Sequence, residues 1–259
     1  MHPTTTPAER LAAVRAEMTR LGLDLLIVRS TDRYLNEYVP HAESTREWLT
    51  GFTGSLGDAL VAHDAAWLFV DGRYHVQADR EAYLSLWTVV KNSLGVTNER
   101  ACGDKLIELA KKTDATLAVG YEPERYGLST LEAFEKQLIG FAIALRPVAP
   151  SPVEAARGLV APTVTGRGAL RVLDESTLGR TVAEKVSDIA TWLKERRADA
   201  LWVTKLDEIA WLTNLRGDEM AYQATFRAEA LVTRAEALVH VHVAEVTEAV
   251  RAARPTVRS

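Results

Sequence analysis

The sequence predicts an α/β protein made of two similar domains, each with a mixed β-sheet flanked by helices. Three observations lead to this fold class. Short apolar runs of strand length alternate along the chain with amphipathic segments of helical period. The helix start at Thr6 is repeated at Thr181, 175 positions later. Between the two copies, residues 147–179 are rich in proline and glycine, which is typical of a domain linker.

In the first domain, capping and turn residues separate the expected elements. Thr6 and Glu9 form a capping box that starts a helix, and Gly22 ends this helix. The apolar runs 58–62 and 67–70 predict a β-hairpin. The other expected elements are strands at 25–28, 86–90, 116–119 and 141–145 and helices that start at 75, 99 and 129, the last with Ser129 and Glu132 as a second capping box.

The second domain repeats the beginning of the first. Thr181 and Glu184 form a third capping box, a strand follows at 200–203, and a hairpin is expected at 230–233 and 238–241. The sequence ends soon after this hairpin, where a full sheet needs more strands, so we expect the second domain to be incomplete. We place the first domain at 1–150, the linker at 151–180 and the partial second domain at 181–259.

The amino-acid composition limits the classes of partner and compartment that we expect for this chain. The chain has 259 residues, 47% of them hydrophobic and 25% charged, with a formal net charge of -4. This balance argues against a nucleic-acid partner or an anionic membrane surface. Cys102 is the single cysteine, which excludes an intramolecular disulfide and suits a reducing compartment. We find no secretory signal and no apolar run of roughly 18 residues, so we expect a cytoplasmic protein without a membrane partner.

Ser55 is the first candidate for a catalytic nucleophile. Thr53-Gly54-Ser55-Leu56-Gly57 is one residue away from the G-x-S-x-G nucleophile elbow. That elbow needs a strand before the serine and a helix after it, whereas a strand follows Ser55 here. The pattern favours a structural turn, and a serine hydrolase that uses Ser55 is the weaker alternative.

Two further pairs of residues have a plain interpretation and a functional one. His240 and His242 alternate on a strand and share one face, as two metal ligands would, but a solvated strand face is the simpler reading. Asp207 and Glu208 are adjacent in a helix, so their side chains point about 100° apart. This geometry favours stabilisation of a helix start over an acid/base pair.

The motif Asp71-Gly72-Arg73-Tyr74 has two open interpretations. Its side chains could pair locally, or they could contact a ligand or a partner.

Two long motifs carry a family resemblance. Trp48-Leu49-Thr50-Gly51-Phe52-Thr53-Gly54-Ser55, together with residues 37–40 and 71–78, resembles the first amino-terminal domain of the Xaa-Pro aminopeptidases (aminopeptidase P), a domain of the creatinase type. Residues 206–217, LDEIAWLTNLRG, are similar to the hallmark of the second domain in the three-domain, cytosolic-type enzymes. Residues 222–226 depart from that family, because Tyr-Gln-Ala-Thr-Phe replaces the usual Tyr-Asn-Pro-Val-Phe.

The resemblance implies a family of metallopeptidases, hydrolases that remove the amino-terminal residue in front of a proline. Two divalent metals, Mn or Zn, belong to a third, catalytic domain, with which no segment of this chain can be aligned. We therefore expect no catalytic, cofactor-binding or metal-binding residue in this chain. The resemblance also implies a homodimer, a catalytic domain in cis or in trans, and an entrance or interface surface at Phe52, Thr53, Arg73 and Tyr74.

We therefore predict that the chain is the non-catalytic amino-terminal region of a metal-dependent Xaa-Pro aminopeptidase. This region is expected to serve dimerisation and active-site gating. The alternative is a stand-alone module that binds a peptide or a small molecule on the same fold, without peptidase activity.

Overall fold

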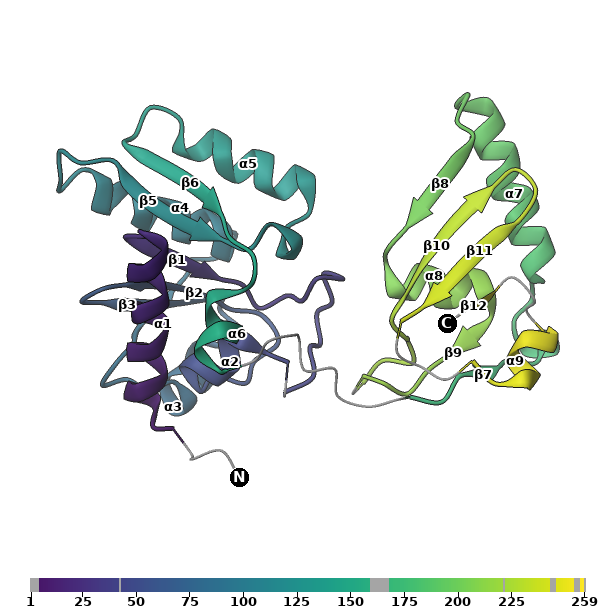
Figure 1. The fold of residues 1–259 in the computed structure, drawn as a ribbon, viewed down its shortest axis with the longest axis horizontal. Helices are drawn as coiled ribbons and strands as arrows, with labels where there is room; N and C mark the ends of the chain where they lie inside the picture. The colour runs from purple at the N-terminus through teal and green to yellow at the C-terminus, as the bar shows by residue number, and fades with distance from the viewer. Residues whose placement is uncertain are drawn as a thin grey trace. The chain divides into compact units, whose positions relative to one another are not determined.

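The computed structural model describes residues 5–41, 43–158, 168–220, 222–242, 246–253 and 257–258. The chain divides into two compact units, one that ends at Thr163 and one that begins at Val164 (Figure 1). Both units are mixed α/β structures, as the sequence predicts.

The first unit is built on a six-stranded sheet in the order β4-β3-β2-β1-β5-β6. All of its strands are parallel except β2, which is antiparallel to both of its neighbours. Its elements are α1 (Pro7–Leu21), β1 (Leu25–Val28), α2 (Thr45–Thr50), β2 (Asp58–Ala62), β3 (Ala66–Val70), α3 (His75–Glu81), β4 (Thr88–Lys91), α4 (Asn98–Ala110), β5 (Leu117–Tyr121), α5 (Leu128–Leu138), β6 (Ile143–Pro147) and α6 (Pro152–Ala156), with a short 3-10 turn at Pro123–Arg125.

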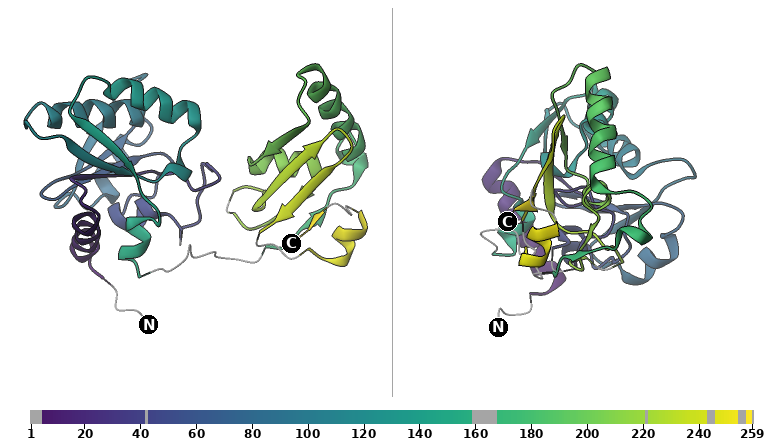
Figure 2. Two further views of the ribbon diagram at one scale, coloured as in Figure 1. Left: turned by 45° about the horizontal axis from the view of Figure 1, so that its top comes forward. Right: turned by 90° about the vertical axis from the view of Figure 1, so that its right-hand side faces the viewer.

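Both faces of this sheet are covered by helices. On one face Leu26 and Val28 of β1 pack with Val14 and Met18 of α1. On the opposite face alternate strand residues pack with Leu106 of α4 and with residues of α5. Figure 1 and the left view of Figure 2 show α1 and α5 on opposite sides of the strands. Burial on both faces explains why the central strands are continuous apolar runs.

Local sequence determines where α1 begins and ends. The Thr6 hydroxyl accepts from the Glu9 amide and the Glu9 carboxylate accepts from the Thr6 amide, which confirms the predicted capping box. Gly22 has φ 62°, and this left-handed conformation favours glycine at the end of a helix.

The capping box predicted at Ser129 is wrong. Helix α5 begins at Leu128 with Gly127 as its N-cap, and no side chain caps it. Leu131 and Phe134 pack in the core from this earlier start, so tertiary packing overrides the local capping signal.

The segment expected to be a linker, 151–180, contains folded parts of both units. Helix α6 packs against α1 and α2, and Val153 is completely buried in the first core. Further on, β7 (Arg171–Val172) pairs with β9 (Leu215–Arg216) in the second unit. Described apolar side chains of this stretch, Val153 and Leu170 among them, are buried.

The second unit has a four-stranded sheet in the order β12-β11-β10-β8. Its other elements are α7 (Val182–Glu195), β8 (Ala200–Val203), α8 (Leu206–Thr213), β10 (Ala228–Thr233), β11 (Ala237–Val241), α9 (Glu248–Ala253) and β12 (Val257–Arg258), with a 3-10 turn at Glu175–Thr177. The Thr181–Glu184 capping box is confirmed. The sequence reading missed α9 and β12, which follow the predicted hairpin.

The repeat predicted from the sequence extends to topology. The strand order β12-β11-β10-β8 corresponds to the order β4-β3-β2-β1 in the first unit, and β12 runs parallel to β11 as β4 does to β3. The second unit therefore reproduces the first half of the first unit.

Candidate functional site

Parallel strands bring the polar residues of the first unit to one edge of its sheet. Arg29 follows β1, Asp71 follows β3 and Glu122 follows β5, while Asp58 begins the antiparallel β2. All of these residues therefore lie at the carboxyl ends of the parallel strands. In open α/β sheets this edge is where ligands bind, so it is the first place to examine.

Arg29 is the centre of a buried ionic group at this edge. Its Nη1 lies 2.9 Å from Asp58 Oδ2 and its Nη2 lies 2.8 Å from Glu99 Oε1. Its guanidinium carbon lies 4.6 Å from the centre of the Tyr126 ring. Burial raises the pKa of Asp58 despite Arg29. Burial would also raise the pKa of Glu99, but Arg29 and nearby hydrogen bonds outweigh it and hold that pKa below its ordinary value. The group links β1, β2 and α4.

Arg125 forms a second buried group beside the first. Its Nε donates to Glu122 and its Nη1 donates to the carbonyl oxygen of Thr31, which lies in the loop after β1. The other Glu122 oxygen accepts from Ser151 Oγ at 2.9 Å. The sheet edge between β1 and β5 is thus occupied by the protein's own side chains, which is a structural use of a common ligand position.

The Phe52 side chain lies in the core instead of on the surface where the sequence analysis expected it. It is 0% exposed and meets the Tyr74 ring edge to face, with ring centres 5.7 Å apart. Arg46, itself buried, donates to the carbonyl oxygens of Phe52 and Gly54 and lies over the Phe52 ring at 4.8 Å. These contacts fix the backbone of the turn 51–57.

Of the other predicted residues, Thr53 and Arg73 are exposed, whereas Tyr74 is half-buried. The Thr53 amide and hydroxyl each donate to Glu81 Oε2 at 2.8 Å. Arg73 is exposed, and its Nη2 lies 2.8 Å from Asp71 Oδ2. Its guanidinium carbon lies 5.2 Å from the centre of the Tyr74 ring. We call Thr53, Asp71, Arg73, Tyr74 and Glu81 the turn surface. A role of this surface at an entrance or interface stays a prediction.

Ser55 has structural contacts. Its hydroxyl lies 2.8 Å from the Tyr74 hydroxyl and 3.2 Å from Glu37 Oε1. Neither partner is the imidazole base of a hydrolase triad, and strand β2 follows the turn. The geometry favours the structural turn over the nucleophile.

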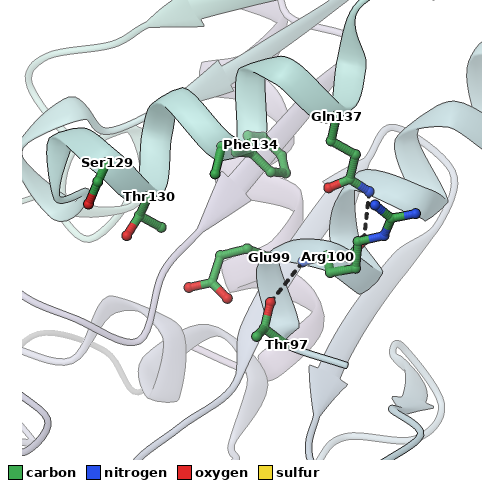
Figure 3. A pocket seen from close by; sticks show the side chains of 8 residues that line it. Thr97, Glu99, Arg100, Ser129, Thr130, Phe134 and Gln137 are labelled. Carbon is green, nitrogen blue, oxygen red and sulfur yellow. Dashed lines mark hydrogen bonds between the residues drawn. The ribbon is translucent and has the colours of Figure 1, made fainter. Parts of the chain in front are cut away.

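A cleft of about 530 Å³ lies between the amino-terminal end of α4 and helix α5, along most of its length (Figure 3). Its lining residues are Thr97, Glu99, Arg100, Ser129, Thr130, Ala133, Phe134 and Gln137. Gln137 Nε2 donates to the Arg100 carbonyl oxygen at 3.0 Å and to Asp104 Oδ1 at 2.9 Å. Sequence reasoning missed this cleft because it treated Ser129 as a helix cap, whereas the residue lines the cleft from within α5.

Two candidate pairs of residues lie in the second unit. The rings of His240 and His242 meet edge to face with centres 5.0 Å apart, and His242 Nε2 lies 3.9 Å from Glu229 Oε1. Within the part of the chain that the structure describes, no three His, Cys, Asp or Glu side chains are grouped to hold a metal. Asp207 and Glu208 lie exposed in the first turn of α8, as expected for helix stabilisation. No described helix combines the length and the apolar character that crossing a membrane requires.

The fold and the polar edge together define a class, a protein of two related α/β units whose first sheet edge is closed by structural ion pairs. The profile of the Creatinase/Prolidase N-terminal domain matches residues 10–158, and a second profile with the same description matches residues 162–257. The chain belongs to the creatinase/prolidase N-terminal domain family.

Similar proteins agree with this assignment. A probable Xaa-Pro aminopeptidase P of Coprinopsis cinerea is 31% identical over 96% of this chain and 39% of its own length. One from Talaromyces stipitatus is 33% identical over 89% of this chain and 34% of its own length. An X-prolyl aminopeptidase of Caenorhabditis elegans, described as a cytosolic enzyme with a di-nuclear active site, shares the fold with a TM-score of 0.85 at 24% identity, over 98% of this chain and 42% of that one. The chain thus spans about two fifths of the length of such relatives.

Proposed function

We propose that this chain is the non-catalytic amino-terminal region of a metal-dependent Xaa-Pro aminopeptidase, which removes an amino-terminal residue in front of proline. One observation carries the proposal. Relatives named as probable Xaa-Pro aminopeptidases match nearly the whole chain, yet the chain covers only 39% of the length of the Coprinopsis cinerea relative. The matched profiles describe an N-terminal domain in both units.

In this proposal the two divalent metals, Mn or Zn, belong to the catalytic part of the longer proteins. The residues described here do not fit such a pair. Among the residues that the structure describes, no three His, Cys, Asp or Glu side chains are grouped so that they could hold a metal. We therefore assign no step of hydrolysis to this chain.

The proposed roles of the chain are dimerisation and gating of the active site. The turn surface supports the gating role because its polar groups are held in place before any partner binds. Asp71 and the Tyr74 ring orient the exposed Arg73, and Glu81 holds Thr53. Preorganised groups lose less entropy when they contact a substrate or a neighbouring subunit.

We place the protein in the cytoplasm. Cys102 is its single cysteine and lies buried in the first core. Burial raises the pKa of this thiol far above its ordinary value, so it is a packing residue and not a reactive thiolate. A single buried thiol is typical of proteins in a reducing compartment.

The test uses the purified chain alone. We expect no stoichiometric binding of Mn or Zn in metal analysis and no cleavage of an Xaa-Pro peptide. Turnover that disappears on chelation, in a preparation free of contaminating peptidase, would contradict the proposal. Light scattering at micromolar concentration should give the mass of a homodimer, and a strictly monomeric mass would remove the dimerisation role.

A further inference from the structure

The cleft between α4 and α5 lies where open α/β sheets commonly bind small molecules. Helix α4 follows β4 and helix α5 follows β5, so both helices begin beyond the carboxyl ends of parallel strands. The cleft volume of about 530 Å³ is within the range of roughly 300–1,000 Å³ that is typical of small-molecule sites. The position and the size of the cleft therefore suit a small-molecule ligand.

Helix α5 contributes two hydroxyl groups to the cleft. Ser129 and Thr130 lie in the first turn of α5 and line the cleft. Among the described residues, neither hydroxyl has a hydrogen-bond partner. The N-cap of α5 is Gly127, so no capping side chain covers the first-turn amides beside them. Each hydroxyl can donate one hydrogen bond and accept others, so this side of the cleft can pair with either kind of polar group.

Helix α4 contributes a carboxylate on the opposite side. Figure 3 shows Glu99 on the α4 side of the cleft and Ser129 and Thr130 on the α5 side. The Glu99 side chain is 26% exposed, and its Oε1 lies 2.8 Å from Arg29 Nη2. Burial would raise the pKa of Glu99, but Arg29 and nearby hydrogen bonds hold that pKa below its ordinary value. Glu99 is therefore an ionised acceptor near neutral pH, and Arg29 uses only part of its roughly four lone-pair sites.

The charges around the cleft favour a neutral ligand. Arg29 already matches the charge of Glu99, and the starts of α4 and α5 carry partial positive charge. An ammonium group would be repelled by these positive charges, and an anion would be repelled by the Glu99 carboxylate. A hydroxyl group avoids both penalties, because it donates to the carboxylate and accepts from a serine or threonine hydroxyl. Two neighbouring hydroxyls can pair with Glu99 and with the α5 hydroxyls together.

We propose that the cleft binds a vicinal diol of a neutral small molecule. The diol donates to Glu99, its oxygens pair with Ser129 and Thr130, and the carbon face of the ligand lies against Ala133 and Phe134, which also line the cleft. Two sources share this chemistry, a neutral sugar and the ribose of a nucleoside. The inference goes beyond the proposed function, since it requires no peptidase activity.

The experiment titrates the isotope-labelled full chain with maltose and, separately, with adenosine, and follows the backbone amide signals by NMR. We expect saturable shifts at residues 97–100 and 129–134 with at least one of these two diols. The matched ligand control is 2′,3′-dideoxyadenosine, which lacks the diol and should bind at least tenfold more weakly than adenosine. Methylammonium and inorganic phosphate, a cation and an anion, should cause no saturable shift at these residues.

Variants of the chain test the location of the site. The double variant Ser129→Ala, Thr130→Ala removes two hydrogen bonds to the diol and should weaken binding about tenfold. Ala133→Leu places a larger side chain in the cleft and should also weaken binding, while folding is kept because Ala133 is exposed. Ser187→Ala is the matched control, because it removes an exposed helical serine from the second unit. It should leave binding unchanged.

The absence of saturable shifts with both maltose and adenosine would overturn the proposal. Equal binding of adenosine and its dideoxy analogue, without binding of maltose, would overturn the assignment of a diol. Tighter binding of methylammonium or phosphate would overturn the choice of a neutral ligand, and unchanged binding by the double variant and by Ala133→Leu would overturn the location. Because peptidase activity is not measured, failure here is distinct from failure of the proposed function.

Discussion

At the scale of single residues, buried charged side chains of the first unit occupy the sheet edge at which open α/β sheets commonly bind a ligand. Arg29 and Arg125 are 7% and 5% exposed; Arg29 pairs with Asp58 of β2, and Arg125 pairs with Glu122 at the end of β5. Removing one partner of a buried ion pair leaves the other without compensation, which is costly. These residues therefore fix the arrangement of β1, β2, β5 and α4.

Glu99→Gln tests this network through its pH dependence. The pKa of Glu99 is lowered in the folded protein from its ordinary value of 4.5. Its contribution to stability is therefore fully present above pH 4.5 and is lost as the pH falls through the folded value. We expect Glu99→Gln to lower the free energy of unfolding by about 1 kcal/mol near neutral pH. The difference from the wild type should shrink at lower pH in denaturant titrations, and a pH-independent difference would contradict this role.

The turn 51–57 offers a second test at residue scale. A Cβ on Gly54 would overlap the Phe52 ring and approach Tyr74 Cδ1 to 2.8 Å, whereas a Cβ on Gly72 would meet nothing within 4 Å. We expect Gly54→Ala to destabilise the first unit by about 2–3 kcal/mol through overpacking. Gly72→Ala, the matched control, should stay within about 1 kcal/mol of the wild type. Equal melting temperatures of the two variants would show that the turn is not packed as described.

At the scale of elements, the signals that the sequence displays best are local ones. The capping boxes at Thr6 and Thr181, the strand 25–28 and both hairpins follow from turn chemistry and apolar runs, and all are confirmed. Ser129 shows where this reasoning stops, because an equally good capping pattern lies inside α5. The cleft between α4 and α5 and the buried ionic group around Arg29 depend on the order of the strands in the sheet. This order cannot be predicted from local sequence patterns.

The two capping boxes give a matched pair of predictions. Each threonine hydroxyl accepts a backbone amide three residues on, at 3.3 Å for Thr6 and 3.2 Å for Thr181. We expect Thr6→Ala and Thr181→Ala each to cost about 1 kcal/mol. Hydrogen exchange should show the loss in α1 for the first variant and in α7 for the second. A loss spread equally over both units in either variant would contradict two separate cores.

At the scale of the whole molecule, the described strands of the second unit repeat the order of four strands of the first unit. The boundary between the two units after Thr163 leads to a further prediction. Limited proteolysis should cut first within residues 158–168 and leave a stable amino-terminal fragment that retains α6, because Val153 belongs to its core. A stable fragment that ends near Pro150 would contradict the packing of α6.

The most direct test of the account joins this chain to the catalytic part of the Coprinopsis cinerea relative and measures hydrolysis of an Xaa-Pro peptide. We expect the fusion to be active and the chain alone to be inactive. Arg73→Ala should lower kcat/KM of the fusion several-fold while unfolding stays within about 0.5 kcal/mol of the parent, as for an exposed residue. Arg20→Ala is the matched control, since Arg20 is 61% exposed against 62% for Arg73 and is also paired with a nearby carboxylate. A fusion no more active than the catalytic part by itself, or metal-dependent turnover by this chain alone, would contradict the account.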